Sequence, residues 1–367
     1  MKKRKMFTGI GAVLLGVGLL LGGCGEEPKE TDTVKTAEDT AAEEADTEET
    51  DAQKAETQET AAQEQQETAA YDRENSSLPQ WQEQLQAEKT QEIASAAVRG
   101  MQIVKDNETI LAVSYEPRTY KNSYDCWALS IPYESWVSVD TEGMYECFSY
   151  LEQMDLKQVQ VSQEEAGTGE SRTSVFVAYF SGQEEGSAGQ AQPDAGITYR
   201  IGNQDSSGRY YIETSAQDGI WTADPAAVEG LLAADPYDCI LKVANVVSIE
   251  TVSSVDMEIE GKTYTMDLSE QGSYKLSGKE AEQQEVYNLY TSLMSIFVEK
   301  EIEGEQHDSD PMLRITFHRN TEEAPEIVET FYSCGKEYAA VNINGTEFFL
   351  ADREAVEELI GTIKKTF

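Results

Sequence analysis

Histidine and positive charge are both scarce in this sequence. Its 367 residues include only two histidines, His307 and His318, and 28 lysines and arginines against 69 aspartates and glutamates. A Ser-His-Asp or Cys-His triad would have to use one of these two histidines. The net charge of −41 argues against nucleic acid as a partner, because proteins that bind nucleic acid concentrate Lys and Arg on one face.

Several motifs of cofactor and nucleophile chemistry are missing as well. The sequence has no C-x-x-C pair, no glycine-rich phosphate loop and no G-x-S-x-G elbow. We therefore predict no enzymatic activity, no cofactor and no metal site. An envelope hydrolase is the alternative, and it would need one of the histidines, or a pair of carboxylates, in a cleft.

The N-terminus has the layout of a secretory signal. Four of the first five residues are basic, and no charged residue follows between Met6 and Gly23. This apolar stretch is near the lower length limit of a spanning helix and is rich in glycine, which favours a cleaved signal over an uncleaved anchor. It ends in Leu21-Gly22-Gly23-Cys24, which resembles the lipobox of bacterial lipoproteins. The resemblance implies removal of residues 1–23 and lipidation of Cys24, with acyl chains such as palmitate that suffice for stable anchoring in a membrane.

Residues 24–75 are predicted to form a disordered acidic tether. Between 25 and 70 there are 16 acidic residues, three lysines and no Phe, Trp or Tyr. Without apolar side chains to bury, such a segment does not offset the entropy of ordering. It would act as a spacer that spans on the order of 40 Å. The alternative interpretation is that it recruits a cationic partner or metal ions.

The remaining chain is predicted to be α+β, with two similar sheet-and-helix subdomains at 76–240 and 241–367. Apolar periodicity predicts about ββ-α-ββββ-α in each subdomain. Helices are expected at 79–97, 142–156, 224–233, 280–299 and 352–365, and strands at 101–104, 110–115, 126–131, 174–180, 197–202, 209–214, 219–222, 246–259, 262–268, 312–318, 326–333, 337–343 and 346–350.

The ends of the two halves are similar in sequence. Residues 220–231 and 348–359 both place an aspartate, Asp224 or Asp352, between an apolar strand and a helix, and Pro225 then takes the first helical position. We interpret the halves as two copies of one unit, with the loop 182–196 as an insertion in the first copy. Chance similarity of a common strand-to-helix turn is the alternative.

Four cysteines remain besides the lipidated one: Cys126, Cys147, Cys239 and Cys334. Their spacings suit no zinc site, and in an exported protein they could form two disulfides in three connectivities. A domain of this length does not need such cross-links, so we favour buried free thiols.

Four further features are candidates for chemistry. His318 alternates with polar residues in its strand, which favours a solvent-facing position. The polar loop around His307 is expected to be a solvated turn, and a metal loop is the alternative. The segment 203–208 resembles the start of a calcium loop, but it lacks Glu at the twelfth position, so a hairpin turn at Gly208 is favoured. Five aromatic residues could line a groove for glycan or peptide, although core packing is the preferred interpretation: Tyr124, Trp127, Tyr133, Trp136 and Trp221.

One resemblance covers about residues 100–365. The pattern Trp127-Ala128-Leu129-x-x-Pro132, Tyr199-Arg200-Ile201-Gly202, Tyr210-Tyr211-Ile212 and the Trp221 to Asp224 turn resembles the domain of unknown function 4340 family. The resemblance implies an envelope-exposed protein with an auxiliary role, in some cases beside ABC-transporter components, and it implies no active site.

Taken together, the sequence predicts a lipoprotein anchored on the extracytoplasmic face of the cell membrane. Its expected function is that of a non-catalytic binding or accessory module of an envelope or ABC-transporter-associated complex. The alternative is a solute-binding lipoprotein that holds a small ligand between the two halves.

Overall fold

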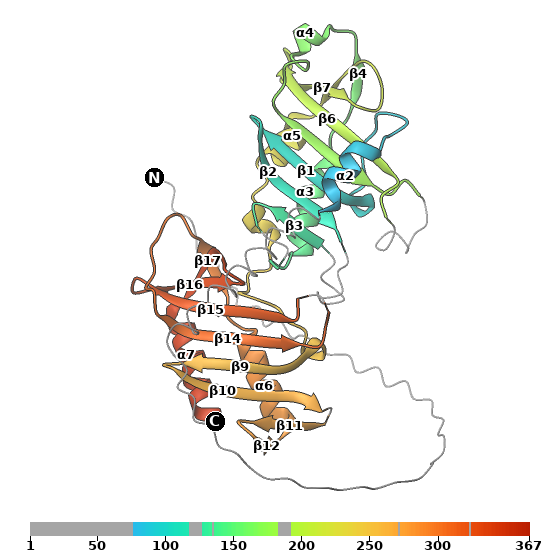
Figure 1. Cartoon of the computed structure of the whole chain (residues 1–367). Helices are drawn as coiled ribbons and strands as arrows, with labels where there is room; N and C mark the ends of the chain where they lie inside the picture. Colours follow the sequence, from blue (N-terminus) through green and yellow to red (C-terminus); the bar gives the residue numbers. More distant parts are fainter. Residues whose placement is uncertain (1–75, 117–126, 134–135, 183–191, 271, 323) are drawn as a thin grey trace, which may run out of the picture. The chain divides into compact units, whose positions relative to one another are not determined.

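The structure, a computed structural model, describes residues 76–116, 127–133, 136–182, 192–270, 272–322 and 324–367 (Figure 1). Several predictions fall outside these ranges: the signal at 1–23, lipidated Cys24, the tether at 24–75, Tyr124, Cys126 and most of the loop 182–196. The predicted boundary between 240 and 241 stays a prediction, and both sheets described below belong to one compact unit, Asp51–Phe367.

The first sheet has eight antiparallel strands in the order β3-β2-β1-β5-β6-β7-β8-β4. Its strands are β1 (Val98–Lys105), β2 (Glu108–Tyr115), β3 (Trp127–Ile131), β4 (Lys157–Val159), β5 (Ser174–Tyr179), β6 (Ala195–Gln204), β7 (Tyr210–Thr214) and β8 (Ile220–Ala223). Its helices are α2 (Ser77–Gln84), α3 (Thr141–Glu152), α4 (Gln163–Ala166) and α5 (Pro225–Leu232), with short 3-10 turns η1 (Ser95–Ala97) and η2 (Pro236–Cys239).

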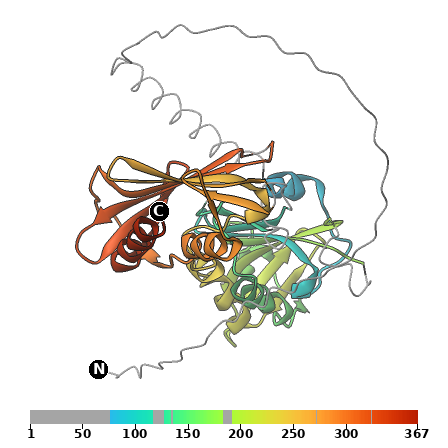
Figure 2. The same cartoon turned by 90° about the horizontal axis from the view of Figure 1, so that it is seen from below.

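The second sheet has nine antiparallel strands in the order β12-β11-β10-β9-β14-β15-β16-β17-β13. They are β9 (Val252–Ile259), β10 (Lys262–Glu270), β11 (Ser273–Leu276), β12 (Lys279–Ala281), β13 (Val298–Glu301), β14 (Pro311–Arg319), β15 (Glu326–Cys334), β16 (Tyr338–Ile343) and β17 (Thr346–Asp352). The helices are α6 (Gln283–Leu293) and α7 (Arg353–Thr366), and the turn η3 (Ile249–Thr251) precedes β9. Figure 2 shows α6 and α7 together on one face of this sheet.

The second sheet repeats the topology of the first over seven consecutive strands. The strand order β2-β1-β5-β6-β7-β8-β4 becomes β10-β9-β14-β15-β16-β17-β13. A 3-10 turn precedes β1 and β9 alike, and α3 and α5 occupy the chain positions of α6 and α7. The predicted α+β fold of two similar sheet-and-helix units is confirmed. We call residues 95–232 the first repeat and residues 249–366 the second repeat.

The matching strand-to-helix turns have the predicted caps. The Asp224 carboxylate accepts a hydrogen bond from the Ala226 amide at 2.9 Å, and Pro225 occupies the first turn of α5. The Asp352 carboxylate accepts from the Glu354 amide at 2.7 Å at the start of α7. Each carboxylate satisfies an amide that has no partner within its helix, which fixes where the helix begins.

The two repeats differ on the sheet face that turns away from their paired helices. In the first repeat α2 covers this face, and Leu78 and Trp81 lie against Gly100, where a methyl group would come within 2.7 Å of the Leu78 side chain. In the second repeat, within the described ranges, no helix covers the corresponding face. The strand registers place polar side chains at the matching positions there: Ser254 for Gly100, Thr316 for Phe176, His318 for Ala178 and Glu326 for Gly196.

Three predicted elements are wrong in part. The helix expected at 79–97 ends at Gln84, because Leu85 adopts an extended conformation and the chain up to Ala94 runs without helix. The strand expected from 246 begins only at Val252, after the turn η3. The helix expected at 280–299 ends at Leu293, because the following residues form β13 against β17 and enter the sheet. The sequence analysis also missed the short elements β4, α4, β11, β12 and β13.

Candidate functional site

His318 lies on the polar face of the second sheet. It alternates on β14 with the buried Phe317, and its side chain is 34% exposed. Nδ1 is 3.0 Å from a carboxylate oxygen of Glu326, and Nε2 is 3.0 Å from one of Asp256. Both ring nitrogens therefore have carboxylate partners on neighbouring strands. The partly exposed position of the His318 side chain agrees with the predicted solvent-facing position.

His307 lies in the segment before β14, against the edge of the same face. Its ring stacks on Tyr332 with centroids 4.6 Å apart, and Nε2 is 3.1 Å from a carboxylate oxygen of Glu347. Nδ1 lies 2.6 Å from the backbone oxygen of Asp308. The contacts with Glu347 and Tyr332 hold the loop on the sheet, whereas Nδ1 contacts a backbone oxygen of the loop itself. Among the described residues no group of three or more His, Cys, Asp or Glu side chains is arranged to hold a metal ion.

The segment 203–208 forms the turn of the β6–β7 hairpin. Gly208 has a φ of 87° and donates its amide to the Asp205 carbonyl, and the Asp205 carboxylate accepts hydrogen bonds from the Ser207 and Arg209 amides. The Asp205 side chain therefore stabilises the turn itself. The favoured interpretation as a hairpin turn is confirmed.

The candidate aromatic residues are mostly core residues. Trp127, Tyr133 and Trp221 are each less than a tenth exposed. Tyr133 contacts Phe349 and donates its hydroxyl to a Glu301 carboxylate at 2.5 Å. Half-buried Trp136 donates its indole N–H to Thr346 at 2.7 Å. The preferred interpretation as core packing holds for the three buried residues.

The three described cysteines are free thiols and buried, as expected. Burial raises the pKa of Cys147 to about 12 and that of Cys239 to about 11. Thiols with raised pKa values are poor nucleophiles, because the thiolate is the reactive form. These side chains therefore serve as small core residues.

Glu329 is a carboxyl group in an apolar core. It is fully buried on β15, and neither of its oxygens has a hydrogen-bond partner among the described residues. Its cross-strand neighbours are Ile315 and Ile343. Desolvation in this environment raises the pKa of Glu329 to about 8, so the neutral acid predominates at pH 7.

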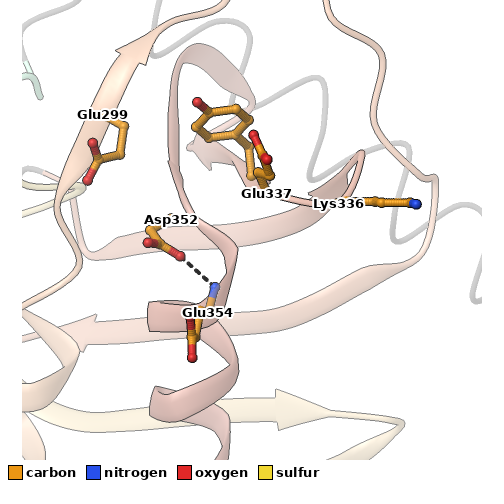
Figure 3. A pocket seen from close by; sticks show the side chains of 6 residues that line it. Glu299, Lys336, Glu337, Asp352 and Glu354 are labelled. Carbon is orange, nitrogen blue, oxygen red and sulfur yellow. Dashed lines mark hydrogen bonds between the residues drawn. The ribbon is translucent and has the colours of Figure 1, made fainter.

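A hollow of about 410 Å³ lies where β13, β16, β17 and α7 meet, and we call it the acidic hollow. Figure 3 shows its lining: Glu299, Lys336, Glu337, Tyr338, Asp352 and Glu354. A second hollow, of about 500 Å³, lies between α6 and α7 and is lined mainly by polar residues of the two helices. Both are open to solvent and lie in the second repeat.

The lining of the acidic hollow is net negative because it has four carboxylates against one ammonium, that of Lys336, and the Lys300 ammonium lies over the ring of Tyr338 at 4.9 Å from its centroid. In Figure 3 the ammonium of Lys336 points away from the Asp352 and Glu299 carboxylates. Lys300 is paired with Glu305, and this ion pair lowers the pKa of Glu305 to about 2. The ammonium of Lys242 donates to the Tyr237 carbonyl and lies over the Tyr237 ring.

An exposed apolar cluster adjoins the acidic hollow. Phe297 is 59% exposed and Leu241 is 39% exposed, and they are two of the three large hydrophobic side chains that the described part of the chain exposes. Val243 pairs with Phe297 in an antiparallel bridge, and the Val298 amide donates to the Lys242 carbonyl at 3.2 Å. We call Leu241, Val243 and Phe297 the Phe297 patch.

Sequence reasoning missed this patch for a specific reason. The sequence analysis placed Phe297 within the predicted helix 280–299. The helix ends at Leu293, and its buried residues are Val286, Leu289, Tyr290 and Leu293. The one available signal was the run of Val298 and alternating charged residues after Phe297, which is typical of an edge strand.

None of the helices in the described ranges combines the length and the apolarity needed to cross a bilayer. Comparisons with protein-family models, with curated proteins and with solved structures gave no match. The resemblance to the domain of unknown function 4340 family therefore stays a prediction.

Proposed function

We propose that this chain is a lipoprotein anchored through Cys24 on the extracytoplasmic face of the cell membrane, where it acts as a non-catalytic binding or accessory module of an envelope complex. The basic N-terminus, the uncharged stretch to Gly23 and the Gly-Gly-Cys ending support the anchor. An ABC-transporter component is one candidate for the partner, and nucleic acid is not.

The observation that carries the binding role is the Phe297 patch. A large aromatic side chain that is 59% exposed costs free energy in water, and exposed apolar patches with polar rims mark interaction sites. Of the other phenylalanines with described burial, five are buried and three are half-buried (Phe180, Phe348 and Phe367), and none is exposed. Phe297 is thus the one exposed phenylalanine among the described residues.

The contacts of the histidines support a non-catalytic role. A general base needs a ring nitrogen that can accept a proton from a bound substrate. The nitrogens of His318 face Asp256 and Glu326, and those of His307 face Glu347 and a backbone carbonyl.

The anchor is tested by mass spectrometry of the protein purified from membranes of a bacterial host. We expect a mature N-terminus at Cys24 that carries acyl chains, and we expect Cys24→Ala to leave an unprocessed and unacylated chain. An unmodified N-terminus on the wild-type protein would contradict the proposal.

The binding role is tested by photo-crosslinking on intact cells, with a photoreactive amino acid at position 297. The matched control carries the same amino acid at position 258, where exposed Glu258 lies on β9. We expect a discrete cross-linked envelope protein from position 297 only. Equal or absent cross-linking at the two positions would show that the Phe297 patch has no dedicated partner.

The alternative, a solute-binding lipoprotein, stays a prediction. It predicts that a small ligand raises the melting temperature of the purified chain.

A further inference from the structure

The Phe297 patch and the acidic hollow adjoin each other along the chain. Phe297 and Glu299 are both exposed and are separated only by the buried Val298, and the register of β13 with β17 shifts between Val298 and Lys300. Glu299 lines the acidic hollow, and Phe297 is joined to Val243 in the antiparallel bridge. An apolar contact and a group of carboxylates are therefore next to each other.

We infer that this surface docks a positively charged amphipathic segment of a partner protein, with apolar side chains on the Phe297 patch and lysines or arginines in the acidic hollow. The inference rests on the proposed function and names the partner class of the same site. The electrostatic part follows from the lining, where the carboxylates of Glu299, Glu337 and Glu354 are exposed. Charge complementarity of this kind steers association and fixes register.

The apolar residues of this surface distinguish a basic amphipathic segment from other possible ligands. A free cation would make no use of Phe297, and the described carboxylates form no metal-ligand set. An anionic lipid surface would meet a chain with a net charge of −41, which opposes close approach. A second copy of the chain would bring the same carboxylates to the contact. A basic and apolar segment satisfies both parts of the surface.

The small size of this surface determines the binding affinity that we expect. The patch has three apolar residues and the hollow has a volume of about 410 Å³, which suits one or two turns of a helix or a short extended peptide. Small interfaces of this kind are weak and transient. We expect binding in the micromolar range that weakens as salt rises.

The experiment uses the acylated full chain in detergent micelles and measures peptide binding by isothermal titration calorimetry. The probes are an amphipathic peptide of lysine and leucine, its glutamate and leucine analogue, and a lysine and serine peptide of equal charge. Vesicles of anionic phospholipid serve as a fourth probe. We expect only the lysine and leucine peptide to bind with micromolar affinity.

Two variants test the two parts of the surface. F297S should lower the affinity for the lysine and leucine peptide at least tenfold, and the double variant E299K/E337K should lower it at least tenfold and flatten its salt dependence. Neither glutamate is the N-cap of a helix, and neither carboxylate accepts a hydrogen bond from another described residue. The matched controls are Y287S, which removes another exposed aromatic side chain, and E258K, and each should change the affinity less than twofold.

Three results would overturn the inference: equal loss of affinity in the control variants, undiminished binding by F297S, or vesicle binding that depends on Phe297. Circular dichroism and thermal melts of each variant identify any loss of folding. If the cell experiment yields a cross-linked partner whose contacting segment is not basic, this inference fails and the proposed function stands. If position 297 yields no partner at all, the proposed function fails first.

Discussion

Tyr199 on β6 and Glu329 on β15 occupy the same position in the two repeats. Tyr199 pairs with Val175 and Glu329 pairs with Ile315, and these two residues are themselves equivalent in register with β1 and β9. Tyr199 donates its hydroxyl to the Gln91 carbonyl, whereas neither oxygen of Glu329 has a partner among the described residues. The polar side chain at this core position therefore has a hydrogen-bond partner in the first repeat. In the second repeat its burial without a described partner costs free energy.

The first prediction concerns the pH dependence that Glu329 imposes. Because burial raises its pKa in the folded protein to about 8 from an ordinary value of 4.5, the folded chain holds a proton that the unfolded chain releases. Stability is therefore full below the ordinary pKa and falls as the pH rises toward 8, by at most about 1.4 kcal/mol per unit. Urea unfolding between pH 6 and pH 9 should show this decline, with a plateau above about pH 8.

Glu329→Gln should remove most of the decline, because glutamine carries no ionisable group. The matched control is Tyr199→Phe, which should cost about 1 kcal/mol for the lost hydrogen bond and keep the wild-type pH dependence. Desolvation raises the pKa of Tyr199, so its hydroxyl stays neutral throughout the window. An identical decline in E329Q would assign the pH dependence to other groups.

The repeat could be predicted from the sequence because the apolar pattern of its strands and helices is local and periodic. Strands such as β14, where buried and half-buried residues alternate from Leu313 to Arg319, have the period of two that a half-buried sheet requires. The two helices whose ends were predicted wrongly have a common cause for the error. Helix 79–97 and helix 280–299 each continued an apolar spacing into residues whose tertiary partners favour another conformation, as Val298 does by pairing with Ala351.

The second prediction concerns the helix that covers only one of the two repeats. Gly100→Val should destabilise the chain by about 1–3 kcal/mol, because a Cβ there would come within 2.7 Å of Leu78 and 3.1 Å of Trp81. Tryptophan fluorescence should report the displacement of α2. The control is Ser254→Val at the equivalent position of the second repeat, where no described helix packs and the change should stay within about 0.5 kcal/mol. Equal effects at the two positions would contradict the role assigned to α2.

The third prediction separates the structural role of Asp352 from its place in the acidic hollow. Asp352→Ala should cost about 1 kcal/mol of unfolding free energy, because the Glu354 amide loses its cap. Asp352→Ser keeps a capping oxygen and should recover most of that stability, although it also removes the charge. Thermal or urea unfolding measures both variants, and Asp224→Ala is the matched loss in the first repeat. If D352S were as unstable as D352A, the charge of Asp352 would matter more than its cap.

The candidate site was less accessible to sequence reasoning than the fold. The acidic hollow combines side chains from β13, the β15–β16 turn and the start of α7, which are about 55 residues apart in sequence. No local pattern links Glu299 with Glu354, and acidic residues are common throughout the chain. Phenylalanine is a residue type that proteins usually bury, so Phe297 looked like a core residue in the sequence. Its exposure depends on where α6 ends, which is set by the pairing of β13 with β17.

The fourth prediction concerns the buried hydrogen bond between Tyr133 and Glu301. Tyr133 is 1% exposed, and its hydroxyl donates to the Glu301 carboxylate at 2.5 Å. Burial and this negative charge both raise the pKa of Tyr133, so the hydroxyl stays a donor at any physiological pH. Hydrogen bonds to charged groups contribute about 1.5–3 kcal/mol, so Tyr133→Phe should lower the unfolding free energy by about that amount.

A double-mutant cycle separates the part of this bond that is due to charge from the packing of the Tyr133 ring on Phe349. Glu301→Gln keeps an oxygen acceptor and removes the charge, so it should cost less than Tyr133→Phe. The double variant should be less destabilised than the sum of the single changes, with a coupling of at least about 0.5 kcal/mol. Urea unfolding at pH 7 measures all four proteins. Additive effects would mean that the negative charge of Glu301 adds nothing to its hydrogen bond with Tyr133.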